Sequence, residues 1–233
     1  MARQLEYPQR YWRRDEIPVA DYLMSHQTAL RDEFMAGFAT LEEAIKAQGR
    51  NTLDREDQSP ELAAQFIRTK DDSGELQPSI ESWKNISFKY ENKPANIFQM
   101  VTEADAQKFP TAYKLIKEYG DDCPIANYSC LAPNSVIERH TGPENRDGEF
   151  VRIHIPLIIP EGDVFFECAG EEITWADIWS FNNQLPHSAH NYTTEYRLCF
   201  LIDLRRSAIG MPPGPKYSKR HEVLCPPFER EKK

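Results

Sequence analysis

The sequence has few of the features that mark membrane, secreted or nucleic-acid-binding proteins. No apolar run approaches the roughly 18 residues that a membrane-spanning helix needs. The first residues contain no apolar core of a signal peptide. The 37 acidic residues outnumber the 28 Lys and Arg, and the formal net charge of −9 does not provide the basic surface that nucleic acids require. We therefore expect a cytoplasmic protein with neither a nucleic-acid nor a membrane partner.

Cysteine is scarce and irregularly placed. None of the five cysteines forms a Cys-x-x-Cys pair, which argues against a disulfide scaffold and against a structural zinc site. We expect them to be small buried hydrophobic residues. The 233 residues are enough for one domain with a sizeable core.

The first 82 residues are expected to form helix and loop that pack on a core. Apolar residues from Leu23 to Ile45 recur at spacings of three, four and seven, which predicts one helix with Asp21 as its N-cap and Gly49 as its end. The polar stretch 50–82 predicts a loop with a short helix at 60–67.

Residues 83–206 are expected to form the β core. Short runs of alternating apolar residues are separated by turn residues, and one helix is predicted at 110–119, ended by Gly120. The strands predicted beyond that helix cover 127–132, 135–140, 150–159, 163–168, 176–181 and 196–204. This pattern predicts a mainly β fold with flanking helices, built as an antiparallel sandwich or a jelly-roll barrel. Residues 207–233 predict an extended, proline-rich basic tail.

Four of the six histidines fall within residues 140–190, next to strand ends. They are His140, His154, His187 and His190, and two neutral imidazoles among them could bind a divalent transition metal. We expect His190 to contact substrate or form a wall of the site rather than bind metal.

Two arginines are expected to face the same cavity. Arg152 and His154 project from one side of their strand, while the intervening residues are apolar. Arg197 begins a very apolar strand, where an unpaired charge is costly. A buried arginine favours a carboxylate held by two hydrogen bonds, so these residues indicate a metal site that also binds a carboxylate.

Several motifs in this region resemble those of one known family. They are His140-Thr141-Gly142-Pro143-Glu144-Asn145, Arg152-Ile153-His154, Pro186-His187, Arg197-Leu198 and Asp203, with Trp83, Tyr128-Ser129 and Pro133 upstream. Residues 83–206 closely resemble the aspartyl/asparaginyl β-hydroxylase family, whose members are Fe(II)- and 2-oxoglutarate-dependent oxygenases on a double-stranded β-helix. The resemblance therefore implies a cupin-like core and Fe(II), 2-oxoglutarate and O₂ as cofactor and cosubstrates.

The resemblance assigns a role to each matching position. It makes His140 and His187 the iron ligands, and it places Arg197 and Ser129 on the distal carboxylate of 2-oxoglutarate. His154 matches a residue near the metal-binding end of the oxoacid, and Arg152 matches a position that contacts a substrate or oxoacid carboxylate.

Other matching positions are expected to lie beside the iron or the substrate. Gly142 stands where most related oxygenases carry a metal-binding carboxylate, which this family typically lacks. Asn182 and Asn183 replace a pair of aspartates that the family usually carries, so the iron site is less negative than in its relatives. Asn145 and His190 are assigned to the substrate or the surroundings of the iron.

The implied function is hydroxylation of an unactivated C–H bond in a small amino-acid-like or carboxylate substrate. Two alternatives stay open. Without a carboxylate ligand, chloride could bind the iron and the protein could be a radical halogenase. The chain could also be a non-catalytic, cupin-like metal-binding module. The sequence does not decide between a small-molecule and a peptide substrate, nor does it fix the oligomeric state.

Overall fold

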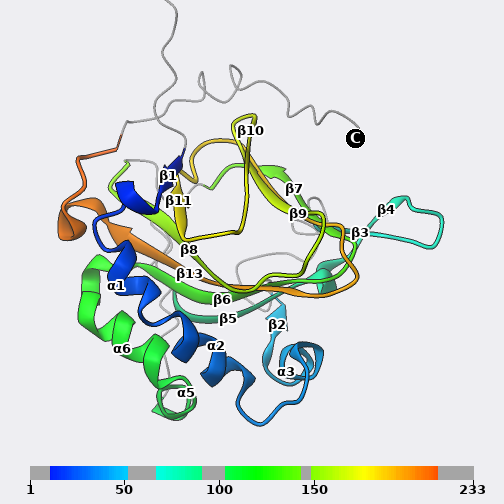
Figure 1. Ribbon diagram of the computed structural model, residues 1–233, viewed down its shortest axis with the longest axis horizontal. Coiled ribbons are helices and arrows are strands. Elements are labelled where there is room, and N and C mark those ends of the chain that lie inside the picture. The colour runs from blue at the N-terminus through cyan, green and yellow to red at the C-terminus, as the bar shows by residue number, and fades with distance from the viewer. Residues whose placement is uncertain (1–10, 52–66, 91–102, 143–147, 215–233) are drawn as a thin grey trace, which may run out of the picture.

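The molecule is built on two antiparallel sheets that face each other, as the ribbon in Figure 1 shows. The structure is a computed structural model and describes residues 11–51, 67–90, 103–142 and 148–214. The seven-stranded sheet has the order β1-β11-β8-β13-β6-β5-β2, and the six-stranded sheet has the order β10-β9-β12-β7-β3-β4.

The strands of the seven-stranded sheet are β1 (Tyr11–Arg13), β11 (Trp179–Phe181), β8 (Phe150–Ile158), β13 (Arg197–Arg205), β6 (Ile125–Leu131), β5 (Trp83–Tyr90) and β2 (Arg50–Asn51). Those of the six-stranded sheet are β10 (Glu171–Ile173), β9 (Val164–Cys168), β12 (His187–Asn191), β7 (Ser135–His140), β3 (Ile67–Lys70) and β4 (Leu76–Pro78).

The eight strands from β6 to β13 form a double-stranded β-helix. The chain changes sheet at every step in this stretch except between β9 and β10, which is the winding of a jelly roll. The predicted fold class is therefore confirmed. Six predicted strands correspond to β6, β7, β8, β9, β11 and β13, whereas β12 and β10 were not predicted.

Helices cover the outer face of the seven-stranded sheet (Figure 1). They are α1 (Ala20–Met24), α2 (Gln27–Met35), α3 (Leu41–Gln48), α5 (Glu103–Lys108) and α6 (Pro110–Tyr119). Leu30 and Phe34 of α2 pack in one cluster with Val151 and Ile153 of β8. This packing fixes which side of β8 faces the helices and turns its other side toward the space between the sheets. None of the described helices is long and apolar enough to cross a membrane.

The single helix expected over 21–49 is wrong, because three short helices replace it. Gly37 takes a positive φ of 85° between α2 and α3, a conformation that a continuous helix cannot contain. Thr40 then starts α3 with a reciprocal cap in which its hydroxyl accepts from the Glu43 amide. Asp21 lies inside α1 and is not a cap. Gly49 ends α3 as predicted.

The expectation of loop throughout 50–82 is also wrong. β3 pairs with β7, and β4 pairs with β3. Farther upstream, β1 adds a strand to the seven-stranded sheet by pairing with β11. The N-terminal region thus contributes strands to both sheets as well as helices. The helix expected at 60–67 lies almost wholly outside the described residues, as does the tail from 215. The four described cysteines are buried, as expected, and none of them is joined to another by a disulfide.

A buried carboxylate joins the helices to the sheet. Glu33 of α2 accepts hydrogen bonds from the backbone amides of Thr111 (2.7 Å) and Ala112 (2.9 Å), which begin α6. The same carboxylate accepts from the Tyr128 hydroxyl of β6 at 2.7 Å. A negative charge at a helix N-terminus is favourable because the helix dipole is positive there. Burial, followed by the charge of Glu33, raises the pKa of Tyr128 well above its ordinary value.

We predict that Glu33→Ala lowers the free energy of unfolding by about 2–3 kcal/mol, because buried donors lose a charged acceptor. Urea unfolding followed by circular dichroism measures the change. Glu42→Ala is the matched control, because its ion pair with Lys46 is exposed to solvent and contributes little to stability. Equal effects of the two substitutions would contradict the bridging role of Glu33.

Candidate metal and carboxylate site

His140 and His187 lie side by side in the six-stranded sheet. His140 is the last residue of β7 and His187 is the first residue of β12, and the two strands pair them directly. Their ring centroids are 4.3 Å apart. The antiparallel register therefore delivers two imidazoles, distant in sequence, to one point between the sheets.

Backbone carbonyls orient both rings. Nδ1 of His140 lies 2.8 Å from the carbonyl oxygen of Glu138, and Nδ1 of His187 lies 2.8 Å from that of Leu185. Since a carbonyl oxygen only accepts, each Nδ1 carries a proton, and in the neutral ring the lone pair is then on Nε2. This tautomer, fixed by a second hydrogen bond, is the one found in metal-binding histidines.

Burial keeps His187 neutral. The side chain lies fully inside the protein, and this burial, followed by the charge of His140, lowers the pKa of His187 well below its ordinary value. A neutral imidazole is the form that binds metal. His187 therefore does not have to lose a proton before it can act as a ligand near neutral pH.

Arg197 of β13 lines a pocket that His140 and His187 also line. It is only 2% exposed, and its guanidinium lies 4.7 Å from the ring of Trp175. Nη1 donates to the carbonyl oxygen of Ser129 at 3.3 Å and to the Cys199 sulfur, whereas Nε has no hydrogen-bond partner. Within the described residues, no carboxylate pairs with Arg197. A buried cation in this state favours an anionic ligand.

Ser129 is arranged to assist Arg197. Its hydroxyl oxygen accepts a hydrogen bond from Trp83 Nε1 at 2.9 Å, so the hydroxyl proton is available to a further acceptor in the pocket. Both residues line the pocket with Arg197. The three side chains come from β5, β6 and β13, which are neighbours in the seven-stranded sheet.

His154 lines the same pocket and is packed among aromatic side chains. It stacks on Trp179 with ring centroids 4.3 Å apart and an interplanar angle of 19°. Burial, followed by the charges of Arg197 and Arg152, lowers the pKa of His154 well below its ordinary value. Nδ1 of His154 and the indole nitrogens of Trp175 and Trp179 are buried and have no hydrogen-bond partner in the part of the chain that the structure describes. These orphaned groups are the kind that a bound polar ligand satisfies.

Arg152 lines the pocket as predicted, but the carboxylate that it binds is a side chain of the protein itself. Nε and Nη2 donate to the two carboxylate oxygens of Asp203 at 2.8 and 2.9 Å. The two residues are paired across β8 and β13. The contact of Arg152 with a substrate or oxoacid carboxylate stays a prediction, because Asp203 already supplies a bidentate partner.

The asparagines lie in the turn that leads to His187. The amide of Gly142 donates to the carbonyl oxygen of Asn183 at 2.6 Å, which ties the end of β7 to this turn. The side chains of Asn182 and Asn183 are buried, and neither of their amide nitrogens has a hydrogen-bond partner among the described residues. The two residues are not among those that line the pocket. Asn145 lies outside the described residues.

The structure does not bring His190 to the pocket. His190 is three residues after His187, so it projects from the opposite face of β12. There it stacks on Phe165 at 4.3 Å and lies within hydrogen-bond distance of Ser188 and Tyr192. Because β12 was not predicted as a strand, the spacing of three residues could not be used to infer the outward direction of His190. Within the described residues, no group of three His, Cys, Asp or Glu side chains is placed to hold a metal.

Fold and pocket together define a jelly-roll protein with two adjacent histidines and a buried arginine between its sheets. A family model described as "Aspartyl/Asparaginyl beta-hydroxylase" matches residues 24–207. The chain therefore belongs to this family, and the match includes the helices upstream of the region where the motifs lie.

The relatives found are distant. The aspartyl/asparaginyl beta-hydroxylases of Mus musculus and Homo sapiens are each 30% identical over 79 residues, which is 33% of this chain and 10% of theirs. The alignment thus spans about a tenth of those curated relatives. Among solved structures, a Pseudomonas putida prolyl-4-hydroxylase aligns with a TM-score of 0.40 and 15% identity, over 80% of this chain and 89% of that one. An oxidoreductase of the 2OG-Fe(II) oxygenase family from Burkholderia pseudomallei aligns with a TM-score of 0.36 and 10% identity, over 65% and 75%.

We predict that His187→Ala loses bound Fe(II), whereas His190→Ala keeps it, because only His187 faces His140. Iron content after anaerobic loading and desalting measures the difference. Both variants remove one imidazole from β12, so each controls for the other, and thermal unfolding of the metal-free proteins checks that both fold. Retention of iron by His187→Ala together with its loss from His190→Ala would overturn the assignment.

Proposed function

We propose that the protein is an Fe(II)- and 2-oxoglutarate-dependent oxygenase that hydroxylates an unactivated C–H bond. The observation that carries this proposal is the buried Arg197, which has no carboxylate partner among the described residues, in the pocket that His140 and His187 line. Family membership supports the reaction type. The donor set fits the metal, because two neutral imidazoles suit a divalent transition metal and leave coordination positions for other ligands.

Each group has a distinct task in this proposal. His140 and His187 would hold Fe(II) through Nε2. Arg197 and Ser129 would bind the distal carboxylate of 2-oxoglutarate, one by charge and the other by its hydroxyl proton. The bound iron and oxoacid would supply the activation of O₂ and the removal of hydrogen from the substrate.

The protein itself supplies positioning and a dry environment. Trp175 and Phe166 are buried and surround His154, and Phe181 packs 4.8 Å from His187. These rings shield His154 and His187 from water, which strengthens electrostatic contacts to a bound anion. The pocket itself has a volume of about 50 Å³, room for a few water molecules. A 2-oxoglutarate molecule is larger than this volume. It can therefore enter only when lining side chains move, first among them Trp175, which lies over Arg197.

We predict that Arg197→Ala weakens 2-oxoglutarate binding about a hundredfold, because the anion loses a buried charged donor. Ser129→Ala weakens it a few fold, and Arg197→Lys restores only part of the loss because a point charge cannot replace the planar fork. Anaerobic calorimetry on the Fe(II)-loaded protein measures the affinities.

Arg205→Ala is the matched control for these variants. It removes an arginine from the same strand, but one that pairs with Asp122 and Glu149 near the surface. Its affinity for the oxoacid should stay that of the unmodified protein. An Arg197→Ala variant that binds as well as the Arg205→Ala variant would remove Arg197 from the proposed role.

The substrate is proposed to be a small amino-acid-like or carboxylate molecule. The test is a screen of such compounds with Fe(II), 2-oxoglutarate and O₂, in buffers with and without chloride, read by product mass. The expected product has gained one oxygen atom. A product in which chlorine replaces hydrogen, formed only in chloride, would identify a halogenase. Failure to form succinate with any of the compounds would favour the non-catalytic metal-binding module.

We predict that Gly142→Asp lowers turnover. Gly142 is buried, and its amide is bonded to the turn before His187, so a new carboxylate there would be crowded and would carry charge into the pocket region. Succinate formation measures the effect, and Gly142→Asn separates crowding from charge. Higher turnover in Gly142→Asp would show that the site is built for a carboxylate ligand.

A further inference from the structure

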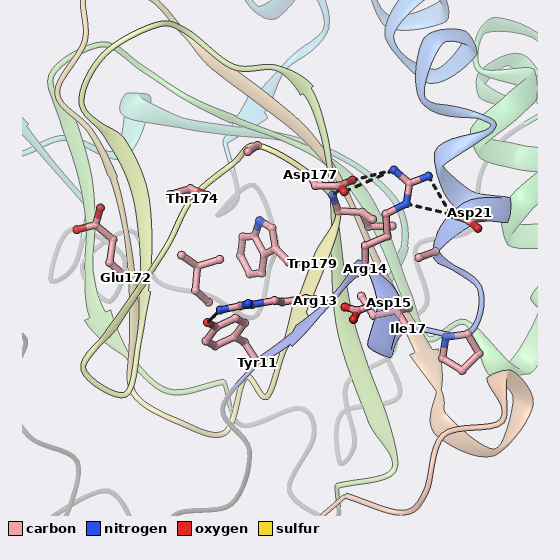
Figure 2. A pocket seen from close by; sticks show the side chains of 15 residues that line it. Tyr11, Arg13, Arg14, Asp15, Ile17, Asp21, Glu172, Thr174, Asp177 and Trp179 are labelled. Atoms are coloured by element: carbon pink, nitrogen blue, oxygen red, sulfur yellow. Dashed lines mark hydrogen bonds and ion pairs between the residues drawn. The ribbon is translucent and has the colours of Figure 1, made fainter.

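A second, larger cleft lies at the open side of the barrel, between β1 and β10 (Figure 2). Its volume is about 790 Å³, within the range of sites that bind small molecules. Tyr11, Arg13 and Trp179 line one side, and Glu172 and Ile173 line the other. The motifs that indicate the iron site include none of these residues.

Strand β1 builds one wall of this cleft. It is the edge strand of its sheet, and its register opposes Tyr11 to Phe181 and Arg13 to Trp179. Trp12 packs into the core on the helix side. Because side chains alternate along a strand, Tyr11 and Arg13 project from the opposite face, into the space between the sheets.

One layer of aromatic residues separates the cleft from the histidine pocket. Trp179 lines the cleft and stacks on His154, which lines the inner pocket. Phe181, the partner of Tyr11, packs against His187. A molecule in the cleft would thus lie beside the rings that cover the proposed iron site.

The two arginines of the cleft differ in their partners. Arg14 pairs with Asp21 and Asp177, as the dashed lines in Figure 2 show. Arg13 donates to the Tyr11 hydroxyl at 3.2 Å, and no carboxylate of the described residues forms an ion pair with its guanidinium, although the charges of Glu16 and Asp15 act on it. Arg13 is therefore the cation of this cleft that a ligand can use. Its hydrogen bond to Tyr11 also limits the directions in which the guanidinium can turn.

The cleft also carries negative charge. Asp15 and Glu172 are among its lining residues, so a ligand with negative charge alone would be repelled by them as well as attracted by Arg13. A molecule with both an anionic and a cationic group suits this mixture, and the Trp179 and Ile173 side chains offer apolar contact to the rest of it.

We propose that this cleft is where a zwitterionic amino-acid substrate first binds, beside the rings that separate it from the iron site, and that Arg13, oriented by Tyr11, receives its carboxylate. The proposal rests on the proposed function for what happens to the bound molecule, but the binding itself does not need iron. Arg13 is thus inferred to determine substrate specificity. Its strand, β1, is not one of the eight strands of the β-helix.

The test uses the twenty proteinogenic L-amino acids as probes, in anaerobic calorimetry with and without Fe(II) and 2-oxoglutarate. For the probes that bind, the α-amide and the desamino acid are titrated next. We expect each to bind about tenfold more weakly than the amino acid, because each lacks one charged group. Arg13→Gln should lose about tenfold for the amino acid and should not change the affinity for the amide. This dependence on the carboxylate separates recognition from a general change of structure.

Arg31→Gln is the charge-matched control. Arg31 is exposed on α2 and pairs with its neighbour Asp32, so its replacement should leave binding unchanged. The proposal is overturned if Arg13→Gln binds the amino acid as well as Arg31→Gln does, if the desamino acid binds as tightly as the amino acid, or if none of the twenty binds. If the protein binds an amino acid in a way that depends on Arg13 but does not bind 2-oxoglutarate, the proposal for the cleft is supported and the proposed function is contradicted.

Discussion

The register of β12 between β7 and β9 is the constraint on which the site depends. Side chains alternate along a strand, so a slip by one residue would turn His187 away from His140. The same slip would bring Ser188 and His190 to the face between the sheets. Asn191 fixes the end of the strand, because its buried side chain donates to the carbonyl oxygens of Leu131, Ala132 and Glu195. Ala189 packs inward in the cluster between the sheets. A polar strand is thus held in one register by a buried amide and one small apolar residue.

Burial gives the pocket its chemical character. The same exclusion of water lowers the pKa of His154 and His187 and leaves the Arg197 charge without solvent. The guanidinium is partly stabilised by the Trp175 ring and the Ser129 carbonyl oxygen, yet neither carries a full negative charge. A pocket of neutral imidazoles and one buried cation suits a bidentate, anionic oxoacid better than it suits water.

Much of this arrangement could be predicted from local sequence. The alternation in 150–158 places Arg152 and His154 on one face, and the structure confirms it, because Val151 and Ile153 pack against the helices. The helix at 110–119 is found with the predicted bounds. His140, His187, Arg197, His154 and Ser129 do line one pocket. In each case a period or a motif within a few residues carried the signal.

The remainder depends on contacts that are distant in sequence. β12 reads His-Ser-Ala-His-Asn and has no apolar alternation, so neither the strand nor the outward direction of His190 could be inferred. β1 and β3 are short edge strands that their partners define. The bidentate partner of Arg152 lies 51 residues away at Asp203. For the same reason the cleft beside β1 could not be foreseen, because β1 and β10 are edge strands of different sheets and come together only when the two sheets face each other.

Anaerobic titration of 2-oxoglutarate into the Fe(II)-loaded protein, followed by visible absorption, tests the central claim most directly. Chelation of Fe(II) by the oxoacid gives a charge-transfer band, and the reading needs no knowledge of the substrate. The account predicts a saturable band with one oxoacid per iron, and no band in a His140→Ala, His187→Ala double variant that still folds. A protein that binds Fe(II) but develops no band at saturating 2-oxoglutarate would contradict it.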